Sequence, residues 1–237
     1  MSPFQRHYKK IKIQPPVCHF VLGSGYSSLV DEVIESKVFK NWEERDALSF
    51  KKAGLATPRI LSHQGRFRYF LHKTGSSIVL QCGRLHAYEG HDVSTVVQPV
   101  IQSLLSGCKK FVISNLAGSL KKEHQVGSVV ALTDHLNRTG RSPLVGLSLL
   151  KKQDLKKEDS KDPFPNMNAA YDAALRKSIT QEMLAVGLKV QAGTYVGVLG
   201  PELETPLEIA WLNKSSEGLF DAVGMSTVLE VIALKYL

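Results

Sequence analysis

Short apolar runs alternate along this chain with segments that repeat apolar residues at helical spacing, and this alternation constrains the fold more than any other feature. The apolar repeat at 93–105 follows the i, i+3, i+4 spacing of a one-sided helix. Runs of strand length occur at 17–22, 111–114, 128–132 and 190–198. Alternating strands and helices favour a parallel-rich sheet covered by helices. We therefore expect an α/β fold in a single domain, residues 1–237, with a mixed, mainly parallel β-sheet flanked by helices.

Local signals predict where several elements begin, pair or end. The runs at 67–72 and 77–82, joined by a turn containing Gly75, are typical of a β-hairpin. Pro99 must be tolerated by the helix at 93–105 or kink it. The T-x-x-E patterns that begin at Thr205 and Thr227 predict helix starts with capping boxes. Residues 168–187 have a helical pattern, and 137–167 are expected to form a long surface excursion.

Composition narrows the class of protein. Hydrophobic residues make up 43% and charged residues 22% of the chain, as in ordinary soluble domains. The net charge of +8 arises largely from lysines interleaved with acids, as at 151–161, which favours a solvated surface over nucleic-acid binding. Three widely spaced cysteines without a CxxC pair indicate neither a disulfide framework nor a zinc site. The sequence has no signal-like apolar segment, so we expect a cytoplasmic protein without a membrane partner.

The segment 83–90 carries the sharpest chemical signal. Arg84, His86 and Tyr88 alternate, so an extended backbone would point all three side chains to one face. An arginine fork matches phosphate oxygens, and histidine adds a donor whose charge changes near neutral pH. A phosphate seat and an exposed polar strand edge are both open interpretations of this pattern.

Four further turns follow strand-like runs and could face a ligand. Ser24 lies between two glycines, and Ser226 precedes a helix start, where hydroxyl groups and backbone amides bind anions or simply cap the helix. The turn at 115–120 follows a strand, where α/β proteins place ligands. The break at 200–205 holds Glu202 and Glu204, either of which could accept N–H groups of a ligand or remain a surface charge.

Taken in order, these segments resemble the trimeric purine nucleoside phosphorylase family. The matching segments are LGSG at 22–25, GRLHAYEG at 83–90, NLAGSL at 115–120, DHLN at 134–137, FPNMNAAYD at 164–172, GPELET at 200–205 and DAVGMST at 221–227. The resemblance implies a nucleoside phosphorylase-like fold and phosphorolysis of purine nucleosides to a free base and ribose 1-phosphate. Inorganic phosphate is the implied co-substrate, with no cofactor and no metal.

The resemblance also implies a role for individual residues. Ser24, Arg84, His86, Ser226 and the backbone of Leu116 would contact phosphate. Tyr88 and Met225 would lie beside the ribose, and Leu203 stands where the family usually has a phenylalanine against the base. His86 and Glu204 would be the catalytic residues, and Phe164 would reach into a neighbouring subunit of a homotrimer.

The implied chemistry indicates a substrate class. A Glu204 carboxylate would accept the N–H groups of a 6-oxopurine, which favours inosine, guanosine and their deoxy forms over adenosine. Members of the family continue beyond the helix that opens at Thr227, so we expect this chain to be C-terminally incomplete and its activity to be low. Two alternatives stay open: an inactive remnant that binds phosphate or nucleoside, and an enzyme like the methylthioadenosine phosphorylases.

Overall fold

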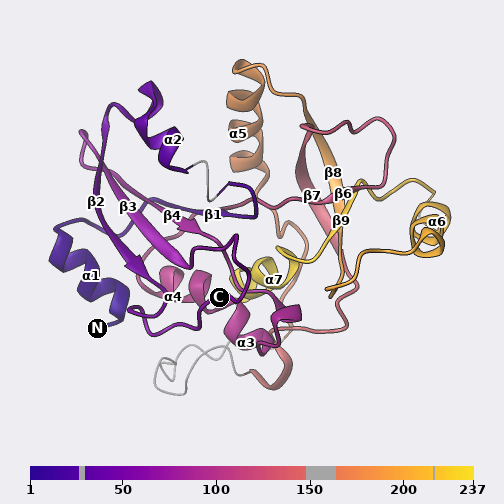
Figure 1. The fold of residues 1–237 in the computed structure, drawn as a ribbon, viewed down its shortest axis with the longest axis horizontal. Coiled ribbons are helices and arrows are strands. Elements are labelled where there is room, and N and C mark those ends of the chain that lie inside the picture. Colours follow the sequence, from indigo (N-terminus) through magenta and orange to yellow (C-terminus); the bar gives the residue numbers. More distant parts are fainter. Residues whose placement is uncertain (27–29, 148–163, 216) are drawn as a thin grey trace. The chain divides into compact units, whose positions relative to one another are not determined.

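Figure 1 shows the computed structural model, which describes residues 1–26, 30–147, 164–215 and 217–237. The chain divides into two compact units, Met1–Leu116 with Leu237, and Ala117–Tyr236. Each unit contains a mixed β-sheet and helices, which confirms the expected α/β class. The strands form two sheets instead of one. The assignment of 1–237 to one domain stays a prediction.

Unit 1 is built around a five-stranded sheet in the order β2-β3-β4-β1-β5. Its strands are β1 (Cys18–Leu22), β2 (Trp42–Ser49), β3 (Arg66–His72), β4 (Ser77–Cys82) and β5 (Phe111–Ile113). β1 runs parallel to β4 and β5, whereas β3 pairs antiparallel with β2 and β4. The β3–β4 pair is the predicted hairpin. The carboxyl ends of the three parallel strands thus emerge at one edge of the sheet, where ligand-binding turns are favoured.

The helices of unit 1 start and stop where local chemistry requires. They are α1 (Pro3–Ile11), α2 (Val30–Glu35), α3 (Val93–Val96) and α4 (Gln98–Leu105), with 3₁₀ turns η1 (Lys37–Phe39) and η2 (Ala87–Glu89). The helix predicted at 93–105 is two helices, because Pro99 lies in the first turn of α4 and cannot donate a backbone hydrogen bond to the preceding turn. Phe4 of α1 packs edge-on against the buried Phe67 of β3.

Unit 2 contains a four-stranded sheet in the order β6-β9-β8-β7. Its strands are β6 (Gly118–Ser119), β7 (Val129–Asn137), β8 (Val190–Gly197) and β9 (Ala222–Gly224). β8 runs parallel to both β7 and β9, and β6 pairs antiparallel with β9. The 3₁₀ turn η3 (Val145–Leu147) and the helices α5 (Ala173–Ala185), α6 (Pro206–Ser215) and α7 (Val228–Tyr236) complete the unit. Val228 and Ile232 of α7 pack against Tyr195 of β8.

Helix starts in unit 2 follow the predicted caps. At α6, the Thr205 hydroxyl accepts the Glu208 amide at 3.2 Å and the Glu208 carboxylate accepts the Thr205 amide at 2.7 Å, which confirms the capping box. At α7, the Glu230 carboxylate accepts the Thr227 amide at 3.1 Å. The predicted surface excursion at 137–167 is described at 137–147 and 164–167, and the lysine cluster at 151–161 lies outside the described residues.

Two expectations concern features spread along the chain. Cys82 and Cys108 are buried, Cys18 is half-buried, and each carries a free thiol. Each helix in the described ranges is too short or too polar to cross a lipid bilayer.

Candidate functional site

Four polar side chains meet at the carboxyl ends of β1 and β4 in unit 1. Arg84 follows β4, is 1% exposed, and donates from Nη2 to the Ser114 carbonyl oxygen. Its backbone N–H donates to Nδ1 of His63 at 3.3 Å, and Nε2 of His63 lies 3.2 Å from the Ser24 hydroxyl. The ring centroids of His63 and His86 are 5.0 Å apart. A guanidinium, two imidazoles and a hydroxyl therefore converge within one unit.

Close packing of two turns depends on glycine in this region. A Cβ atom at Gly23 would lie 2.9 Å from the Ser114 carbonyl oxygen and 3.0 Å from Cα of Asn115. Only glycine lets the turn after β1 approach the turn after β5 this closely. Leu116, which the family resemblance places at the phosphate through its backbone, has a side chain that is 64% exposed. The turns that carry Ser24 and Leu116 thus lie side by side.

Glu89 organises the segment that follows Arg84. One carboxylate oxygen of Glu89 accepts the His86 backbone N–H at 2.7 Å and lies 3.2 Å from Nδ1 of the His86 ring. The other accepts the backbone N–H of Arg59 at 2.5 Å. The backbone turns at Ala87–Glu89 as η2, so the extended conformation expected through 88 is wrong beyond His86. Tyr88 instead stacks on the His86 ring, with centroids 4.7 Å apart and planes at 16°.

The protonation of these groups follows from burial and from neighbouring charges. Burial, the Arg84 guanidinium and His63 lower the pKa of His86 to about 4, although Glu89 opposes the change. Burial and Arg84 also lower the pKa of His63. Burial alone would raise the pKa of Glu89, but amide hydrogen bonds from Arg59 and His86 lower it overall. At neutral pH the cluster therefore presents one guanidinium cation beside two neutral imidazoles, each with one N–H donor.

Unit 2 brings together the turns at 200–205 and 221–227. Gly200 has φ of +72°, and a Cβ atom there would collide with the side chain of Met225. The Ser226 backbone N–H donates to the Tyr195 hydroxyl at 3.4 Å. Thr227 is buried with φ of +73°, a conformation that is costly for a β-branched residue and that tends to occur at ligand sites. Met225 and Ser226 are therefore held in one defined arrangement.

The remaining predicted residues of unit 2 face solvent to different degrees. Glu204 is half-buried at the start of α6, whereas Leu203 is 78% exposed and Phe164 is 83% exposed. In the ranges that the structure describes, no group of three or more histidine, cysteine, aspartate or glutamate residues is arranged to hold a metal ion.

Comparisons with known proteins give a family for this arrangement. The sequence profile of the phosphorylase superfamily matches residues 36–235. Purine nucleoside phosphorylase 1 of Bacillus subtilis is 31% identical over 223 residues, which are 94% of this chain and 75% of that protein. The purine nucleoside phosphorylase of Mycobacterium leprae is 36% identical, with 91% of this chain and 69% of that protein covered. That of Mus musculus is 32% identical, with coverages of 93% and 71%.

The chain belongs to the purine nucleoside phosphorylase family. The matched region includes the GRLHAYEG, GPELET and DAVGMST segments on which the resemblance depends. In this phosphorylase, unit 1 groups Ser24, Arg84, His86 and Tyr88, and unit 2 holds Met225 and Ser226. Family membership confirms the resemblance and the fold class, while the role of each site residue stays a prediction.

The sequence did not predict that His63 and Glu89 belong to the polar cluster around Arg84 in unit 1. His63 lies in an irregular segment before β3, and no spacing relates it to Ser24 or Arg84, which it joins in space. Glu89 could have been predicted, because the H-x-x-E spacing from His86 is that of a capping pair, and these two residues cap the start of η2. The Glu89 contact with Arg59 had no local signal.

Proposed function

We propose that this chain catalyses the phosphorolysis of purine nucleosides, with inorganic phosphate bound in unit 1 by Arg84, His86 and Ser24. The observation that carries the proposal is the convergence of a buried guanidinium, two imidazoles and a hydroxyl at the ends of β1 and β4. A guanidinium fork matches the oxygens of phosphate, and charged hydrogen bonds of this kind are stronger than neutral ones. The names of the relatives support the same reaction.

His63 extends the proposed phosphate seat. Its Nδ1 accepts the Arg84 backbone N–H, so the remaining ring nitrogen, Nε2, carries the proton and points to the Ser24 hydroxyl. A hydroxyl that accepts this hydrogen bond has its own proton available for an anion. An entering phosphate dianion would raise the pKa of His86, because a nearby negative charge stabilises the imidazolium. The seat would then hold the anion with more positive charge than it carries when empty.

The reaction follows from this charge arrangement. A phosphate oxygen forms a bond to the anomeric carbon of the ribose while the glycosidic C–N bond breaks and its electron pair moves to the purine. The purine takes up the proton that the hydrogen phosphate dianion loses as it becomes ribose 1-phosphate, and both products are released. Fixed donors around phosphate orient the nucleophile, and positioning of this kind accounts for much of the rate of such enzymes.

Substrate preference is proposed to depend on Glu204 in unit 2. Its carboxylate would accept the N–H groups of hypoxanthine or guanine, whereas adenine presents an unprotonated ring nitrogen to the same oxygen. The deoxy forms of inosine and guanosine belong to the same substrate class. The exposed ring of Phe164 supports the further proposal that this residue serves a neighbouring subunit of a homotrimer.

The test is the release of hypoxanthine from inosine with and without phosphate, together with calorimetric titration of phosphate alone. Arg84→Ala should raise the dissociation constant for phosphate about 10- to 150-fold, because a charged hydrogen bond contributes about 1.5–3 kcal/mol. Arg84→Lys keeps the charge without the fork, and Arg45→Ala on β2 is a matched control whose partner is Glu43. Thermal unfolding of each variant shows whether it is folded.

The outcomes separate the candidate functions. Phosphate-dependent release of hypoxanthine supports the proposal. Phosphate binding without release of hypoxanthine would identify an inactive remnant that binds phosphate. Release of adenine from methylthioadenosine, with no release of hypoxanthine from inosine, would indicate an enzyme like the methylthioadenosine phosphorylases. Equal phosphate affinity in the wild-type chain, Arg84→Ala and Arg84→Lys would contradict the proposed phosphate seat.

A further inference from the structure

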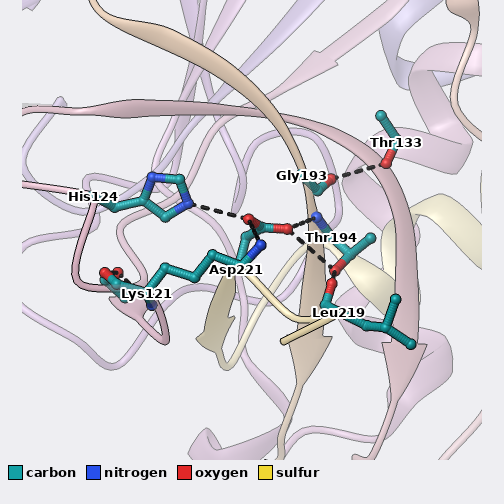
Figure 2. A network of polar contacts seen from close by, with 8 residues as sticks. Lys121, His124, Thr133, Gly193, Thr194, Leu219 and Asp221 are labelled. Atoms are coloured by element: carbon teal, nitrogen blue, oxygen red, sulfur yellow. Dashed lines mark hydrogen bonds and ion pairs between the residues drawn. The ribbon is translucent and has the colours of Figure 1, made fainter. Parts of the chain in front are cut away.

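Asp221 stands at the centre of a polar network in unit 2, immediately before β9. Figure 2 shows Lys121 and His124 approaching one side of its carboxylate and Thr194 the other. Oδ1 lies 3.0 Å from Lys121 Nζ and 3.2 Å from His124 Nε2. Oδ2 accepts the Thr194 backbone N–H at 2.8 Å. The Asp221 side chain is only 9% exposed, so a nearly buried carboxylate is compensated on both of its oxygens.

The backbone of Asp221 forms hydrogen bonds to the same two segments as its side chain. Its N–H donates to the Thr194 carbonyl oxygen at 3.2 Å, and its carbonyl oxygen accepts the Leu120 amide at 2.9 Å. Thr194 lies on β8, and Leu120 follows β6. Asp221 therefore joins three segments that are far apart in the sequence, through its backbone and its side chain together.

The space for the carboxylate is built into β8. A Cβ atom at Gly193 would lie 2.6 Å from Asp221 Cγ and 2.8 Å from Oδ2. The neighbouring Thr133 hydroxyl donates to the Gly193 carbonyl oxygen at 3.1 Å, which holds this part of β8 against β7 (Figure 2). The Asp221 carboxylate therefore occupies space that a side chain at 193 would need, so the position of the carboxylate is limited sterically as well as electrostatically.

The pairing between β9 and the edge strand β6 is short. Only two residue pairs, Gly118 with Val223 and Ser119 with Ala222, join β6 to β9. The strand ends at Gly224, and Met225 and Ser226 follow at once. The Asp221 contacts lie at the beginning of the strand and the Tyr195 contact with Ser226 lies beyond its end. A short strand fixed at its beginning transmits that position to the residues that follow it.

We propose that Asp221 is a positioning residue, whose contacts with Lys121, His124 and Thr194 fix β9 and thereby place Met225 and Ser226. This inference rests on the proposed function and on the family resemblance, which assigns Met225 to the ribose and Ser226 to phosphate. A displacement of about 1 Å at a reacting group lowers the rate of an enzyme about a hundredfold. The network therefore acts on the reaction without touching a substrate.

The experiment compares Asp221→Asn with the wild-type chain. Asparagine keeps the shape of the side chain and can still accept the Thr194 amide, but it loses the charge that faces Lys121 and His124. The kcat/KM for phosphate should fall between ten- and a hundredfold. Hydrogen exchange of the amides of residues 222–226 should become faster than in the rest of unit 2. Lys121→Met, on a partly exposed side chain, should give smaller changes in the same direction, and the double variant should not be additive.

Asp172→Ala is the matched control for a loss of stability alone. Asp172 caps α5 through the Leu175 amide at 2.7 Å, so this variant also removes a carboxylate bound to a backbone amide of unit 2. It should lower thermal stability and leave the kcat/KM for phosphate and the exchange of residues 222–226 as in the wild type. If Asp221→Asn and Lys121→Met match Asp172→Ala in both measurements, the positioning role is overturned.

If the proposed function is wrong, the hypoxanthine assay shows it independently of the positioning role. A wild-type chain that releases no hypoxanthine overturns the proposed phosphorolysis, and the exchange comparison then decides the placement of Met225 and Ser226 by itself. Faster exchange at residues 222–226 in Asp221→Asn than in Asp172→Ala supports the positioning role, and equal exchange overturns it.

Discussion

Replacing His86 by glutamine should make the chain less sensitive to acid. Burial and the Arg84 guanidinium lower the pKa of His86 to about 4 in the folded chain, against an ordinary value of 6.5. As the pH falls below 6.5, the unfolded chain binds a proton that the folded chain still refuses, so the free energy of unfolding falls. The loss is complete below a pH of about 4. The loss amounts to about 3 kcal/mol, because each unit of difference between the folded and unfolded pKa values of His86 corresponds to about 1.4 kcal/mol.

Urea unfolding followed by circular dichroism at about pH 7, 6, 5 and 4 measures this loss. Between the two extremes, His86→Gln should lose about 3 kcal/mol less unfolding free energy than the wild-type chain, since the two proteins share their other titrating groups. Ser103→Ala changes a buried group that does not ionise in this range, so its effect should be the same at each pH. If His86→Gln keeps the pH dependence of the wild type, burial of a neutral His86 is the wrong explanation.

Two further predictions concern unit 2. Glu204→Gln should weaken the binding of hypoxanthine and guanine while leaving phosphate affinity nearly intact. Glu202→Gln changes the exposed neighbouring carboxylate and should alter neither affinity. Calorimetry with each ligand measures both affinities, and equal losses for base and phosphate would indicate a structural role of Glu204. Arg138→Leu removes the guanidinium that lies 4.9 Å from the ring centroid of Trp211 on α6, so urea unfolding should show a loss of about 0.5–1 kcal/mol, and an unchanged midpoint would contradict a cation–π contribution.

Pro99 and the segment after Arg84 show how far local signals reach. The proline marked the position where the predicted helix at 93–105 divides, but whether a helix kinks or divides depends on what packs around it. The alternation of Arg84, His86 and Tyr88 predicted one extended face, and the backbone follows it only as far as His86. The Glu89 carboxylate then draws the chain into η2 through contacts with His86 and with Arg59, which lies 30 residues away.

The sequence alone predicts the α/β class, the β3–β4 hairpin, the Thr205 cap of α6 and the family, because each depends on residues within a few positions of one another or on ordered motifs. Only the tertiary structure shows that His63 joins Ser24 to Arg84, that the Glu89 carboxylate accepts the Arg59 amide, and that Lys121 and His124 contact Asp221. These contacts connect residues whose spacing in the chain carries no period. Their positions are set by the pairing of strands and the burial of side chains, which bring distant segments into contact only once the sheets have formed.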